Sequence, residues 1–165
     1  MQVVPNPPHG IAPVSIGMAM DTAVAACAEW GEVKVIGPLP AVPPHIPDRP
    51  PKLYVQPPDA GELGFVVHIE DGRTVTAIEV WRFHNEDADA HVLLDGVDVF
   101  RTPARVLLAR LSEQGHDVQD ADDEYPRVSG LTLAFTRTAG HEVPMDTDGM
   151  PLYFESVLVA AEDYY

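Results

Sequence analysis

The same succession of patterns occurs twice along the chain. Each time, apolar residues at helical spacing are followed by residues that alternate between apolar and polar, as in a strand. Residues 19–31 have helical spacing and end at Trp30-Gly31, and residues 63–83 then alternate between apolar and polar. Residues 102–115 have a second helical spacing, and residues 131–161 contain two more strand-like runs. We therefore predict an α+β fold, a single domain over residues 1–165. Its two helix-plus-antiparallel-strand halves are residues 14–83 and 97–161.

The clearest predicted element is a β-hairpin over residues 63–83. Asp71-Gly72 suits a two-residue type I′ turn, which requires positive φ at both positions. The resulting register pairs Phe65 with Ile78 and puts alternate residues on opposite faces. The predicted core face holds Leu63, Phe65, Val67, Ile69, Ile78 and Val80. The opposite, half-polar face holds Val66, His68, Glu70, Val75, Ala77, Glu79 and Trp81.

The second helix is predicted to begin with Thr102 as N-cap and Pro103 as first helical residue. Its apolar stripe includes Leu108, which we expect to be buried together with Phe65, Ile78 and Phe135. Residues 38–58 contain nine prolines, so we predict a long surface loop with residues 52–55 as an edge strand. Residues 1–13 are predicted to be an extended lead-in, and residues 84–95 an acidic connector.

Charge narrows the range of partners. The net charge is −16, and it divides into −4 for residues 1–83 and −12 for residues 84–165. Such an acidic chain disfavours nucleic acid and membrane surfaces as partners and favours a basic protein. The first residues lack the pattern of a secretory signal and no apolar run is long enough to span a membrane, which predicts a cytoplasmic protein. The single cysteine, Cys27, has the spacing of a buried residue and allows no internal disulfide.

Catalytic motifs are not evident. The sequence contains no phosphate-binding loop, dinucleotide fingerprint, G-x-S-x-G elbow or H-E-x-x-H pair, so we predict a non-enzyme without cofactor or bound metal. One alternative is a small metal-assisted enzyme, because residues 84–91 hold His84, His91 and three carboxylates. Another is acid/base catalysis by His68 beside Glu70 and Glu79. In the simpler interpretation these residues form a solvated loop and a surface histidine.

Binding is the favoured function. Trp81 is predicted on the half-polar hairpin face with His68 and Glu79, where an aromatic side chain suits an interface anchor. The same position also suits a sheet face covered by the Pro-rich loop. The carboxylates Asp120, Asp122, Asp123 and Glu124 lie in an acidic loop, residues 117–124, which could steer a basic partner.

Gly17-Met18, followed by a helix through Val24 to Gly31, resembles the G-M-[ST]-x-x-x-V opening of the β-lactamase inhibitor proteins and of related outer-membrane assembly lipoproteins. Ala19 replaces the capping Ser or Thr, and the inhibitors' disulfides are missing. The resemblance implies two helix-plus-sheet halves whose concave sheet binds a partner. Two lysines against eight arginines are typical of GC-rich bacteria such as actinobacteria. From the resemblance and the acidic charge together, we expect a soluble, immunity-type or inhibitory binding protein, with a structural homodimer as a further alternative.

Overall fold

The computed structural model describes residues 1–39, 49–58, 64–83, 87, 89–138, 143–162 and 164. These residues form fourteen strands in three sheets and only two short α-helices, so the fold is mostly β and the predicted α+β class is wrong. The error has a physical cause. Four of the strands lie in the segments predicted as lead-in or connector, and each is only two to four residues long, too short to show a clear period of two.

The central element is an antiparallel sheet of eight strands, in the order β11-β12-β13-β14-β8-β7-β6-β5. Neighbouring strands are also consecutive in sequence, except where β8 pairs with β14. The strands of one run are β5 (Glu32–Ile36), β6 (Lys52–Gln56), β7 (Phe65–His68) and β8 (Ala77–Trp81). Those of the other are β11 (Val118–Gln119), β12 (Arg127–Val128), β13 (Leu133–Thr136) and β14 (Ser156–Ala160).

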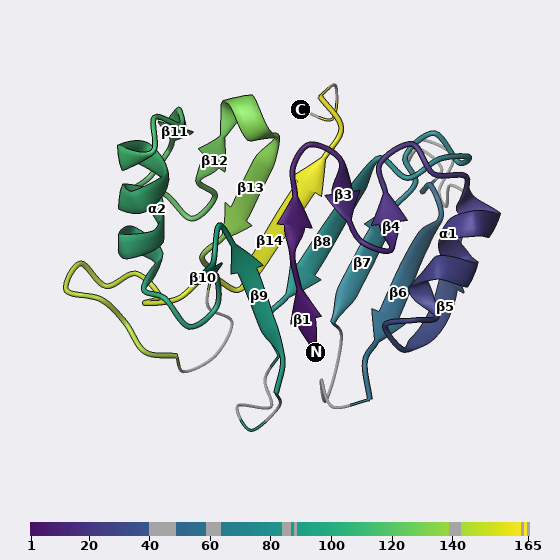
Figure 1. Cartoon of the computed structure of the whole chain (residues 1–165), viewed down its shortest axis with the longest axis horizontal. Helices are drawn as coiled ribbons and strands as arrows, with labels where there is room; N and C mark the ends of the chain where they lie inside the picture. The colour runs from purple at the N-terminus through teal and green to yellow at the C-terminus, as the bar shows by residue number, and fades with distance from the viewer. Residues whose placement is uncertain are drawn as a thin grey trace.

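One face of this sheet is covered by both helices and two small sheets (Figure 1). The helices are α1 (Met20–Cys27) and α2 (Ala104–Glu113), and a 3-10 turn, η1 (Ser129–Leu131), precedes β13. One small sheet consists of β2 (Pro5–Asn6), β3 (Gly10–Ile11) and β4 (Val14–Ser15). The other consists of β1 (Gln2–Val3), β9 (His91–Leu94) and β10 (Val97–Asp98). No helix in the described residues is long and apolar enough to cross a membrane.

The core lies between the sheet and this covering layer. Phe65, Ile78, Leu108 and Phe135 are at most 4 % exposed, which confirms the prediction that they are buried. Their burial follows from the alternation of β7, β8 and β13 and from the apolar stripe of α2. We call the side of the sheet that faces away from both helices the outer face.

Helix α1 is shorter than predicted, because it ends at Cys27 rather than near Gly31. Trp30 is buried, and its ring stacks on Phe65 with centroids 4.1 Å apart. Gly31 is required at the entry to β5, because a Cβ there would lie 2.2 Å from the backbone oxygen of Gln56. Helix α2 begins at Ala104, one residue later than predicted, with Pro103 as its N-cap.

The hairpin between β7 and β8 has a longer loop than predicted. Phe65 pairs with Val80 rather than with Ile78, so the register is shifted by two residues and the faces are preserved. Gly72 has the expected φ of +71°, but Asp71 is not among the described positive-φ residues, so no type I′ turn forms. Instead, the Asp71 carboxylate accepts hydrogen bonds from the Thr74 hydroxyl, at 2.7 Å, and from the N–H groups of Thr74 and Arg73. These bonds lower the pKa of Asp71 to about 2.

The Pro-rich segment contains one strand of the central sheet. Residues 40–48 lie outside the described residues, but residues 52–56 form β6, which is flanked by β5 and β7. The prediction of an edge strand at residues 52–55 is therefore wrong. The edge is β5, which the sequence analysis did not identify, although Glu32, Val33, Lys34 and Val35 alternate between polar and apolar.

Candidate functional site

The outer face contains one continuous row of cross-strand neighbours, one residue from each strand of the sheet. Backbone pairing fixes the row from β11 to β5. Because directly paired residues point to the same face, these side chains lie side by side across the sheet. The row is Gln119, Arg127, Ala134, Leu158, Glu79, Val66, Tyr54 and Lys34.

The middle of this row forms the floor of a cavity of about 460 Å³. Ala134, Leu158 and Glu79 contribute from β13, β14 and β8, and Arg127 contributes from β12. The turn between β11 and β12 and the C-terminal segment supply the other walls, through Asp120, Asp123, Tyr125 and Tyr164. The cavity therefore joins a predicted binding residue of the hairpin, Glu79, to two carboxylates of the predicted acidic loop.

Glu79 is held in place by neighbours on both sides. Its side chain is 15 % exposed, and its Oε1 accepts a 2.7 Å hydrogen bond from Ser156 Oγ on the paired strand β14. Its Oε2 lies 3.5 Å from Nε2 of His68, which is 7 % exposed. The hydrogen bond from Ser156 restricts the rotamers of this carboxylate, so it presents a defined negative charge to the cavity.

Tyr164 connects the C-terminal segment to the same group. Its hydroxyl lies 3.4 Å from Nδ1 of His68, and the two rings meet edge to face with centroids 6.1 Å apart. Burial and the negative charges of Glu70 and Glu79 raise the pKa of Tyr164 to about 12. The phenol therefore keeps its proton at neutral pH and adds no charge to the site.

The four predicted acidic-loop residues do not share one environment. Asp120 and Asp123 line the outer-face cavity, whereas Asp122 lines a second cavity of about 330 Å³ beside α2. Glu124 is exposed, and its backbone oxygen accepts a hydrogen bond from Arg137 N–H. Asp120 is paired with Arg127, whose Nη2 lies 2.7 Å from Asp120 Oδ2.

Trp81 lies on the outer face, as predicted, and pairs with Ser156 in the adjoining row. Its side chain is half-buried, and its indole Nε1 is buried without a hydrogen-bond partner. Trp81 is thus placed beside Glu79 along β8 but does not line the described cavity.

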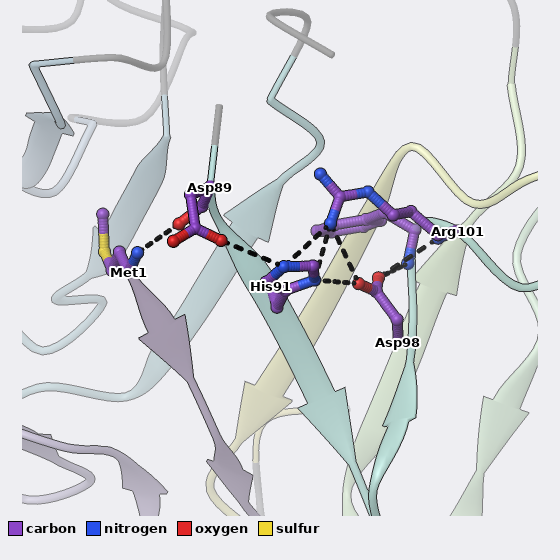
Figure 2. A network of polar contacts seen from close by, with 6 residues as sticks. Met1, Asp89, His91, Asp98 and Arg101 are labelled. Atoms are coloured by element: carbon purple, nitrogen blue, oxygen red, sulfur yellow. Dashed lines mark hydrogen bonds and ion pairs between the residues drawn. The ribbon is translucent and has the colours of Figure 1, made fainter. Parts of the chain in front are cut away.

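The histidines considered for metal binding are separated from this site. His84 lies outside the described residues, and His91 is on β9, in the layer that covers the opposite face. Figure 2 shows the His91 ring between Asp89 and Asp98. Nδ1 of His91 lies 2.8 Å from Asp98 Oδ2, and Arg101 Nη1 lies 3.6 Å from the same oxygen. The described residues contain no group of three or more His, Cys, Asp or Glu side chains arranged to hold a metal ion.

Sequence reasoning missed several residues that line the cavity, among them Tyr125, Arg127, Ala134 and Leu158. It also missed Ser156, which donates a hydrogen bond to Glu79. Leu158 and Ser156 alternate with core residues in β14, so their outer-face position could have been read from that alternation. Arg127 lies in a two-residue strand, which gives no such signal.

Comparison with models of known protein families, with curated proteins and with solved structures gives no match. The resemblance to the β-lactamase inhibitor proteins therefore remains a prediction from Gly17, Met18 and Val24.

Proposed function

We propose that this protein is a non-enzymatic binding protein, of the immunity or inhibitory type, that docks a basic protein partner on its outer face. One observation carries the proposal. The cavity brings Glu79 of β8 together with Asp120 and Asp123 of the β11–β12 turn, on the side of the sheet that neither helix covers.

The outer face also has the composition of an interface. The half-buried apolar side chains of Ala134 and Leu158 are bordered by carboxylates and by Tyr125, which is 58 % exposed. Interfaces combine an apolar centre with a polar rim and are enriched in tyrosine and tryptophan. The net charge of −16 favours a basic partner, because carboxylates speed its approach and repel acidic competitors.

The test begins with capture of a partner from the native lysate and measurement of its affinity for the purified protein. Leu158→Arg places a bulky cation at the centre of the outer face, so it should weaken binding. Val106→Arg is the matched control, because Val106 is 45 % exposed on α2, on the covered side of the sheet. Equal thermal stability of the two variants separates lost binding from lost folding.

Trp81→Ala extends the same test along β8. If the indole is an anchor at the contact centre, its removal should raise the dissociation rate and leave the association rate nearly unchanged. Unchanged affinity in both Leu158→Arg and Trp81→Ala would exclude the outer face as the docking surface. The mass of the purified protein in solution shows whether the captured partner is instead a second copy of this chain.

A further inference from the structure

The lining of the outer-face cavity is strongly unbalanced in charge. Its residues include three carboxylates, Glu79, Asp120 and Asp123, and one cation, Arg127, which is paired with Asp120. No ion pair among the described residues involves Asp123. A cation that enters this cavity therefore meets two carboxylates that lack a permanently charged partner.

A second observation lies directly behind Glu79. His68 is a buried polar side chain whose Nε2 has no hydrogen-bond partner among the described residues. This nitrogen is aimed at Glu79 Oε2, 3.5 Å away, a distance too long for an ordinary hydrogen bond. Among the described residues, the Glu79 carboxylate accepts a hydrogen bond from Ser156 at Oε1, so Oε2 keeps hydrogen-bonding capacity for a donor that enters the cavity.

The remaining walls suit an elongated, partly apolar cation. Ala134 and Leu158 form an apolar floor, and the rings of Tyr125 and Tyr164 stand at the walls. Aliphatic stems pack on such floors while their cationic ends reach polar groups. Tyrosine rings also attract a cation that lies over their faces.

We propose that this cavity receives a single arginine side chain of the basic partner, with its guanidinium group between Glu79 and Asp123. Arginine fits better than lysine, because its planar fork of N–H donors can engage carboxylate oxygens in pairs and can stack on tyrosine. The inference rests on the proposed function and names the group of the partner that the site recognises.

The probe is blocked arginine, Nα-acetyl-arginine methylamide, titrated into the isotope-labelled full chain and followed by amide NMR shifts. We expect saturable shifts at Ala134, Leu158 and Glu79. The neutral isostere, the corresponding blocked citrulline, should produce none. Blocked lysine should bind more weakly than blocked arginine.

Variants of Glu79 and Asp123 test whether these two carboxylates bind the blocked arginine. Glu79→Gln and Asp123→Asn should each weaken binding of blocked arginine by about tenfold or more, because each removes a charge-assisted contact. Glu113→Gln is the charge-matched control on α2 and should bind like the unmodified chain. The amide spectra of all three variants show directly whether each remains folded.

The outcomes separate this inference from the proposed function. Equal binding of citrulline and arginine, or full binding by Glu79→Gln, overturns the arginine pocket. If Leu158→Arg still abolishes partner binding in that case, the docking face stands without the pocket. If blocked arginine binds but does not compete with the captured partner, the site serves a free small cation, and the partner-derived arginine is overturned.

Discussion

Ser156 Oγ donates a 2.7 Å hydrogen bond to Glu79 Oε1, across the one strand pair that joins the two four-strand runs of the sheet. The two residues are 77 positions apart in sequence, and Ser156 is 1 % exposed. This bond therefore contributes both to the joint between β8 and β14 and to the orientation of the candidate binding carboxylate.

Ser156→Ala should lower the free energy of unfolding by about 1–2 kcal/mol, because it leaves a half-buried carboxylate oxygen without its donor. Denaturant unfolding measures the change. Ser15→Ala is the control, since Ser15 is exposed on β4 and should lose far less. An equal loss of unfolding free energy in the two variants would show that the hydrogen bond between Ser156 and Glu79 does not stabilise the fold.

Gly72→Val should destabilise the fold by about 1 kcal/mol or more, because a β-branched residue resists a φ of +71°. No atom lies within 4 Å of a Cβ at this position, so backbone strain alone is tested. Gly130→Val is the matched control, since Gly130 also has open space but lacks a positive φ. An unchanged melting temperature for Gly72→Val would contradict the loop geometry.

Leu108→Ala should cost about 2–5 kcal/mol, the range for a leucine removed from a packed core. Leu108 is 4 % exposed, whereas Val106 on the same helix is 45 % exposed and serves as control when replaced by Ala. Thermal or denaturant unfolding of both variants measures the difference. A loss below about half a kcal/mol for Leu108→Ala would mean that α2 does not pack on the sheet as described, since surface changes fall in that range.

The lowered pKa of Asp146 makes the free energy of unfolding depend on pH in the acid range. Burial alone would raise its pKa, but hydrogen bonds from the N–H groups of Met150 and Asp148 and from buried Arg137 outweigh this and lower the pKa to about 2. A carboxyl whose pKa is lower in the folded than in the unfolded state stabilises the fold fully above the unfolded value of about 4. That stability is lost as the pH falls toward 2.

Asp146→Asn should therefore flatten the fall in stability between pH 5 and pH 2, as measured by urea unfolding across that range. At neutral pH the variant should be less stable, because Arg137, which is 1 % exposed, loses its counter-charge. Asp95→Asn, at an exposed turn, is the control. An unaltered acid profile for Asp146→Asn would contradict the assigned pKa.

Sequence reasoning found the elements in which the spacing of apolar side chains indicates which positions are buried. Leu107, Leu108 and Leu111 mark the buried stripe of α2, and alternation around Phe65 and Ile78 separates the two faces of β7 and β8. A register shift of two residues leaves these faces unchanged, so the face of Glu79 could be predicted while its strand partner could not.

The cavity depends on information that local sequence does not hold. Strands β11 and β12 have two residues each, too few to show a period, and their pairing brings Asp120 and Asp123 over the outer face. The partners Ser156 and Glu79 meet only because β14 inserts between β13 and β8. The acidic loop was predicted as one charged patch, yet its backbone turns Asp120 and Asp122 toward different cavities.

The dissociation rate of the captured partner from two variants of this loop tests the outer-face account most directly. Asp120→Asn/Asp123→Asn and Asp122→Asn/Glu124→Gln remove the same charge from the same loop, so both should slow association and weaken its salt dependence alike. Only the first pair lines the outer-face cavity, so only the first should speed dissociation, by about tenfold. Faster dissociation confined to the second pair, or equal in both, would contradict docking on the outer face.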